Sequence, residues 1–145
     1  MFRFFQKNKY QSYDLDFIER YSSNRKKISN VMIELGFFEE NRYFKHKDTN
    51  YFVEFPSGPL SIGSEPVKEI EELSFSTGIL LIISATECVK DRLAAYFYWD
   101  DKQSLEQALL VSKENKINYQ EIQRWLESEG LREKWLEIMD KFEIN

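Results

Sequence analysis

The sequence has few of the residues on which the commonest metal and cofactor sites depend. Its single cysteine, Cys88, cannot form an internal disulfide, which indicates a reducing compartment. Because the sequence has a single histidine, His46, a zinc site built from several histidines and cysteines is excluded. Its five glycines form neither a P-loop nor a dinucleotide-binding fingerprint.

Long apolar runs and a positive net charge are also missing. The longest apolar run, residues 79–85, falls far short of the roughly 18 residues that a membrane-spanning helix needs. The basic N-terminus lacks the hydrophobic region of a signal peptide. The net charge of −5 gives no general attraction to nucleic acid. We therefore expect a cytoplasmic protein that has no membrane partner and meets nucleic acid only as an acceptor substrate.

The pattern of apolar residues predicts an α+β fold in a single compact domain. A period of two residues is common before residue 84, and a helical period dominates after it. We expect a mixed or antiparallel sheet with a helix in residues 1–84 and a helical part in residues 85–145 that packs on it. The expected strands cover residues 10–18, 37–46, 51–55, 60–63, 69–75 and 79–83.

Capping residues predict where the helices begin and end. The first helix should bury Ile28, Val31, Met32 and Leu35, start after Ser22 or Ser23, and end at Gly36. Three later helices should start at the following signals: the capping box Ser84/Glu87, Asp100 or Asp101, and the capping box Asn118/Glu121. A last helix should carry Trp135, Leu136, Met139 and Phe142 in the core.

The stretch from Tyr13 to Phe17 places two carboxylates one residue apart inside an apolar run. Side chains alternate between the faces of a strand, so Asp14 and Asp16 should share one face. Like charges roughly 7 Å apart repel unless a cation lies between them. A divalent ion such as Mg²⁺ would supply that charge, whereas the simpler alternative is an edge strand whose acids face water.

Glu54 is the third acid of interest, because apolar residues flank it in the expected strand 51–55. Burial of its charge would be unfavourable without a cationic partner or a metal ion. Together with Asp14 and Asp16 it could hold two metal ions that bind a nucleoside triphosphate for attack on the α-phosphate. We interpret Cys88 as a buried structural thiol and His46 as a surface residue, rather than as catalytic groups.

Several ordered motifs give the chain a family resemblance. They are Ser12-Tyr13-Asp14-Leu15-Asp16-Phe17, the run from Phe52 to Pro59, the run from Cys88 to Ala95, and the run from Trp99 to Ala108. In this order they resemble the polymerase-beta-like nucleotidyltransferases, in particular small prokaryotic members related to abortive-infection toxins.

The resemblance implies an activity and a site. The activity is metal-dependent transfer of a nucleoside monophosphate from a nucleoside triphosphate to a hydroxyl, with Mg²⁺ or Mn²⁺, as the toxin of a toxin–antitoxin pair. Asp14, Asp16 and Glu54 match the family's catalytic, metal-binding acids. Arg92, Asp101 and Lys102 match a downstream motif that faces the nucleotide, although a solvated helix face is an equal alternative for these three residues.

The chain departs from the family before the first acid. Such proteins carry a Gly-Ser or Gly-Gly element upstream, whereas only 13 residues precede Asp14 here and the first glycine is Gly36. We therefore expect a protein partner or a second copy of the chain to cover the missing elements. The alternative functions are a catalytically inactive protein of the same fold that acts as a binding or regulatory partner, and a plain α+β interaction module.

Overall fold

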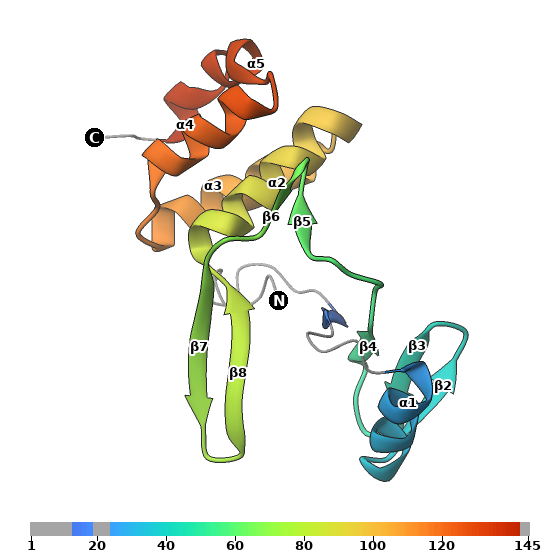
Figure 1. Cartoon of the computed structure of the whole chain (residues 1–145). Coiled ribbons are helices and arrows are strands. Elements are labelled where there is room, and N and C mark those ends of the chain that lie inside the picture. Colours follow the sequence, from blue (N-terminus) through green and yellow to red (C-terminus); the bar gives the residue numbers. More distant parts are fainter. Residues whose placement is uncertain (1–12, 19–23, 143–145) are drawn as a thin grey trace. The chain divides into compact units, whose positions relative to one another are not determined.

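The computed structural model describes residues 13–18 and 24–142, which form two compact units. The sheet unit contains the described residues up to Leu60, and the helical unit begins at Ser61 (Figure 1). The division therefore lies after residue 60 rather than after residue 84, and residues 61–83 belong with the helices. The predicted α+β class is confirmed, with a mixed sheet followed by helices.

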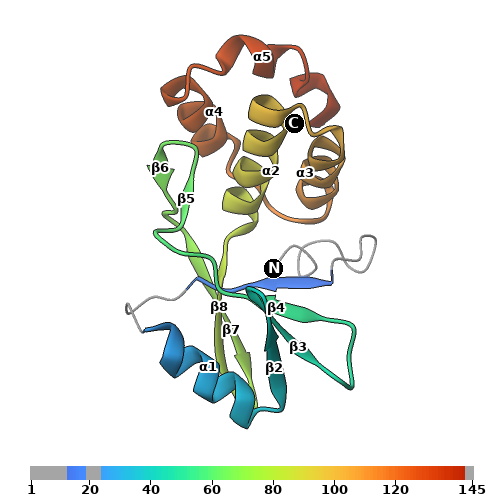
Figure 2. The same ribbon diagram turned by 90° about the vertical axis from the view of Figure 1, so that its right-hand side faces the viewer.

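The sheet unit consists of one helix and a four-stranded sheet. In chain order, its elements are β1 (Asp14–Asp16), α1 (Arg25–Glu34), β2 (Phe37–Glu40), β3 (Tyr43–His46) and β4 (Phe52–Glu54). The strand order is β1-β4-β3-β2, in which β1 is parallel to β4 and the other neighbours are antiparallel. Helix α1 lies beside β2 (Figure 2).

One face of this sheet forms the core of the sheet unit. Its buried members are Met32, Phe44 and Val53, and Phe44 is completely shielded from solvent. The apolar face of α1 is narrower than predicted. Ile28 and Met32 pack on the core, whereas Val31 and Leu35, predicted to be buried, are exposed.

Local sequence signals mark both ends of the first helix, but its N-terminal cap is not one of the two predicted serines. Asn24 caps α1 by accepting a hydrogen bond from the backbone N–H of Lys27; the predicted caps Ser22 and Ser23 lie outside the described residues. The helix ends before Gly36, as predicted, and this glycine has a φ of +89°. A Cβ on it would lie 2.8 Å from the His46 ring. Both the conformation and the space at this position favour glycine.

Residues 37–46 form a hairpin, although their mixture of aromatic and polar residues predicted one strand. Strands β2 and β3 pair antiparallel, and Asn41 at the turn adopts a left-handed conformation with φ of 59°. Asparagine tolerates this conformation better than most residues. The strands expected at residues 37–46 and 51–55 also pair, since β4 is antiparallel to β3 across the turn at residues 47–50.

The helical unit combines two small hairpins with a group of helices. Its elements are β5 (Ser61–Ile62), β6 (Glu65–Pro66), β7 (Ile70–Phe75), β8 (Gly78–Ile83), α2 (Ala85–Trp99), α3 (Lys102–Glu114), α4 (Tyr119–Ser128), α5 (Arg132–Leu136) and η2 (Met139–Phe142). Strands β7 and β8 agree with the strands expected at residues 69–75 and 79–83 and form a hairpin, whereas the pairing of β5 with β6 was not predicted. None of the described helices is both long and apolar enough to cross a membrane.

The helix starts of this unit agree with the capping signals. Ser84, Asp101 and Asn118 each accept a hydrogen bond from a backbone N–H in the first turn of α2, α3 and α4 respectively. The last predicted helix is broken into α5 and η2. It still buries Trp135 and Phe142, whereas Leu136, predicted to lie in the core, is half exposed.

Candidate functional site

Three carboxylates lie on the face of the four-stranded sheet that is turned away from its core. Parallel pairing places Asp16 opposite Glu54, and Asp14 lies two residues before Asp16 on the same strand. Residues paired across neighbouring strands share a face, as do residues i and i+2. The intervening Leu15 and Val53 point into the core. We call this surface the carboxylate face.

The acids on this face differ in exposure and in their partners. Asp14 and Asp16 are exposed, whereas the side chain of Glu54 retains only 18% of its accessible surface. The Arg42 guanidinium supplies the cation that Glu54 was predicted to need, with 3.0 Å between Arg42 Nε and Glu54 Oε1. Glu54 is therefore half buried and charge-paired, and this ion pair was not foreseen from the sequence.

Arg42 also lies against the ring of Tyr43, with its guanidinium carbon 5.0 Å from the ring centroid. The pKa of Arg42 is raised above its ordinary value. Tyr43 makes the largest contribution to this rise, and the charge of Glu54 makes the next largest. Asp16 adds a smaller contribution in the same direction. A single permanently charged side chain thus neutralises part of the negative charge on the carboxylate face.

The donor chemistry of the carboxylate face suits Mg²⁺, but the three acids do not form a ready three-ligand site. Among the described residues, no group of three or more His, Cys, Asp or Glu side chains could hold a metal ion. Mg²⁺ is usually held by one or two carboxylates together with substrate phosphates. Asp14 and Asp16 fit this smaller requirement, whereas Glu54 would first have to leave Arg42.

The downstream residues of the predicted site lie on α2 and α3 in the helical unit. Arg92 donates hydrogen bonds to Asp91 and to the side-chain oxygen of Gln107, which joins the two helices. Asp101 caps α3, where its carboxylate accepts from two backbone N–H groups and from the Ser104 hydroxyl. These contacts give Arg92 and Asp101 structural roles, and Lys102 is exposed in the first turn of α3.

The other two candidate groups, Cys88 and His46, behave largely as the sequence suggested. Cys88 is 3% exposed, and burial raises the pKa of its thiol to about 12, so it is not a nucleophile at neutral pH. His46 is half buried instead of fully exposed, with its ring packed against Phe37 at 5.1 Å. Its Nδ1 accepts a hydrogen bond from the backbone N–H of Asp48.

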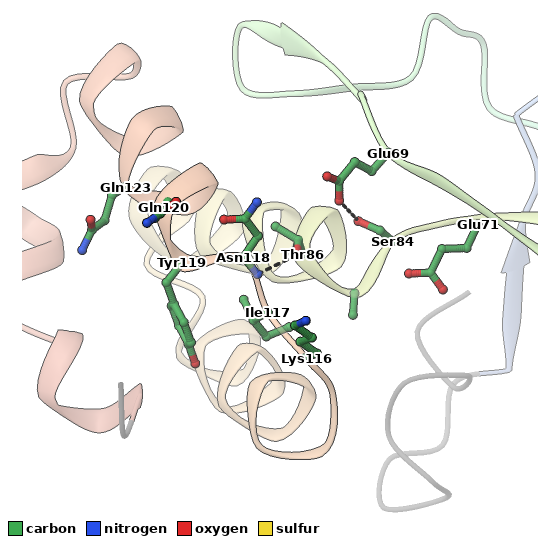
Figure 3. A pocket seen from close by; sticks show the side chains of 11 residues that line it. Glu69, Glu71, Ser84, Thr86, Lys116, Ile117, Asn118, Tyr119, Gln120 and Gln123 are labelled. Atoms are coloured by element: carbon green, nitrogen blue, oxygen red, sulfur yellow. Dashed lines mark hydrogen bonds between the residues drawn. The ribbon is translucent and has the colours of Figure 1, made fainter. Parts of the chain in front are cut away.

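A concave region occurs within the helical unit, where the sequence indicated only helix caps. An open pocket of about 620 Å³ lies where the first turns of α2 and α4 meet (Figure 3). The Ser84 hydroxyl donates to Glu69, and the Thr86 hydroxyl accepts from the backbone N–H of Asn118, each at 3.1 Å. Several polar groups of the pocket thus bind one another and hold these helix ends together.

Comparison with family models, with curated proteins and with solved structures finds no match to this chain. The proposal of a function is therefore based on the carboxylate face and its surroundings.

Proposed function

We propose that the chain is a nucleotidyltransferase-like protein that binds a nucleoside triphosphate and a divalent cation, Mg²⁺ or Mn²⁺, at the carboxylate face. The observation that carries the proposal is the alignment of Asp14, Asp16 and Glu54 on two paired strands. The corresponding reaction is transfer of a nucleoside monophosphate to a hydroxyl acceptor. A role as the toxin of a toxin–antitoxin pair in the cytoplasm belongs to the same proposal.

The distribution of charge supports this assignment. Asp14 and Asp16 are exposed and carry like charges on one face, an arrangement that becomes favourable when a divalent cation binds. The cation would neutralise the triphosphate, and Asp14 and Asp16 would hold it in place. Contacts of Arg92, Asp101 and Lys102 with the nucleotide remain predictions from the family resemblance.

The ion pair between Arg42 and Glu54 favours a second candidate function. An arginine at this place gives the third acid a permanent cationic partner, as expected for a protein of this fold that no longer binds metal there. Such a protein would act as a binding or regulatory partner, either of another protein or of a second copy of itself.

Isothermal titration calorimetry separates the two functions. The wild-type chain and the Asp14→Ala/Asp16→Ala variant are titrated with each nucleoside triphosphate in the presence of Mg²⁺ or Mn²⁺. The matched control is Glu34→Ala/Asp48→Ala, which removes two exposed acids from the same unit but not from the carboxylate face. We expect metal-dependent binding in the wild type and the control, and its loss in the variant.

Two results would contradict the enzyme proposal. One is the absence of binding by a wild-type chain whose circular dichroism shows a folded protein. The other is equal loss of binding in the control variant, which would indicate a general effect of charge. The first result favours the binding or regulatory function, and size-exclusion chromatography with light scattering then tests for a dimer.

A further inference from the structure

The hairpin of β7 and β8 exposes apolar side chains that the helices of its own unit do not cover. It extends from the start of α2 away from the helices (Figure 1). Among the described elements, each of its two strands contacts chiefly the other. Ile79 is 65% exposed, Phe75 53% and Ile70 49%. A two-stranded hairpin is only marginally stable in water unless a third strand or another element packs on it, so we expect a further segment to cover this surface.

The charged residues of this hairpin region are all acids. Residues 69–83 contain Glu69, Glu71 and Glu72 but neither lysine nor arginine. Glu71 and Glu72 are exposed neighbours on β7, so they lie on opposite faces of the hairpin. Each of them is paired with an apolar residue of β8. A segment that covers the hairpin should therefore combine apolar side chains with positive charges.

The beginning of the chain has this composition. Residues 2–7 are Phe-Arg-Phe-Phe-Gln-Lys, which gives three phenylalanines, two cations and no acid. They lie outside the described residues. Their number equals the six residues of β7 and of β8. Arg25, Lys26 and Lys27 also cluster, but they form the first turn of α1. Charge and length thus favour residues 2–7.

We propose that the β7–β8 hairpin is the docking surface for residues 2–7 of the same chain. The phenylalanines would cover the exposed apolar side chains of the hairpin, and burial of apolar surface would supply most of the free energy. Arg3 and Lys7 would lie near Glu71 and Glu72. Exposed ion pairs add little energy, so these charges would chiefly determine which segment docks. This docking does not depend on the proposed binding of a nucleotide.

Hydrogen exchange followed by mass spectrometry tests the docking, because covered backbone amides exchange more slowly than exposed ones. The exchange of residues 69–83 is compared in the full chain and in a variant that lacks residues 2–7. We expect exchange in the hairpin to be about tenfold faster in the deletion variant, and exchange in α4 to be unchanged. Equal exchange of the hairpin in the two proteins would overturn the proposal.

An exchange of charges provides a test in which no residue is deleted, and it decides the question if circular dichroism shows that the deletion variant does not fold. Glu71→Lys/Glu72→Lys should make hairpin exchange about threefold faster or more, because these lysines would repel Arg3 and Lys7. Addition of Arg3→Glu/Lys7→Glu should restore the wild-type rate to within about twofold. Hairpin exchange as fast with all four substitutions as with the first two would contradict the docking.

The matched control is Glu106→Lys/Glu137→Lys, which reverses two exposed acids elsewhere in the helical unit. It should leave hairpin exchange unchanged, and an increase equal to that of Glu71→Lys/Glu72→Lys would show a general effect of charge and overturn the proposal. Size-exclusion chromatography with light scattering identifies the occupied form. Slow hairpin exchange that occurs only in a dimer would assign residues 2–7 to the hairpin of a second copy and overturn docking within one chain.

Discussion

Charged side chains are arranged differently in the two units. In the helical unit, Lys90 and Glu87 are almost completely buried, with 3.1 Å between Lys90 Nζ and Glu87 Oε2. Lys90 also reaches Glu121 at 3.3 Å. In the sheet unit, Asp14 and Asp16 are exposed on one face, and Arg42 lies beside them. The charges are shielded from solvent in the first case and accessible to it in the second.

This comparison separates a structural from a functional use of the same residue types. A buried charge needs a partner inside the fold, so its removal should change stability. Exposed charged side chains should add little to stability, which is consistent with the binding function proposed for the carboxylate face. The predictions below test this distinction, and they begin with the helical unit.

Breaking the buried pair should have the largest effect. We expect Lys90→Met to lower the free energy of unfolding by about 3–5 kcal/mol, because Glu87 would be left buried without its cation. Urea unfolding followed by tryptophan fluorescence measures this change. The signal reports on the helical unit, which contains Trp99, Trp125 and Trp135.

The double variant Glu87→Gln/Lys90→Met is the control for this prediction. It removes both charges, so it should regain a large part of the stability that Lys90→Met loses. If the double variant were as unstable as the single one, packing of the lysine chain, rather than charge, would explain the loss.

Acidic pH should lower the stability of the helical unit, because Glu121 belongs to the same ion-pair network as Lys90. The hydrogen bond from Arg124, helped by Lys90, lowers the pKa of Glu121 from 4.5 to about 2. Arg124 and Lys68 also lower the pKa of Glu65. A lowered carboxyl pKa stabilises the fold above the unfolded value of 4.5, and this stabilisation is lost as the pH falls from 4.5 towards 2.

Urea unfolding at a series of pH values between 7 and 2 checks this dependence. Glu121→Gln should make the free energy of unfolding vary less over the acidic range, because that group no longer titrates. An unchanged slope in this variant would show that Glu121 does not contribute.

Removal of a helix cap should have a smaller effect. The Asp101 side chain accepts from the backbone N–H groups of Gln103 and Ser104 at the start of α3. Asp101→Ala should lower the free energy of unfolding by about 1 kcal/mol. Asp101→Asn should leave it almost unchanged, since asparagine caps equally well. Equal loss in both variants would indicate that the charge, rather than the cap, is important.

Local signals in the sequence predicted the helices better than the site. Ser84, Asn118 and Gly36 act within one turn of their own positions, and all three mark helix ends as predicted. The hairpin at residues 37–46 was missed because its turn, at Asn41 and Arg42, contains no glycine or proline and lies within a run of mixed aromatic and polar residues. Its turn depends on one left-handed residue.

The site depends on contacts between distant residues, which periodicity does not reveal. The alternation of residues 13–17 placed Asp14 and Asp16 on one face, but the pairing of Asp16 with Glu54 joins strands separated by a helix and a hairpin. The ion pair of Arg42 with Glu54 follows from the missed hairpin. Likewise, the spacing of Ser84 and Glu87 predicted that Glu87 belongs to a capping box. In the structure its side chain instead pairs with Lys90 inside the fold.

The smallest expected effect on stability is at the carboxylate face itself. Asp14→Asn/Asp16→Asn should change the free energy of unfolding by less than about 0.5 kcal/mol, because both side chains are exposed and loss of like charges relieves repulsion. Urea unfolding followed by far-ultraviolet circular dichroism checks this value. A loss comparable to that of Lys90→Met would show that these acids hold the sheet together. Unchanged stability with loss of nucleotide binding would instead show that this unit places its charges for a ligand.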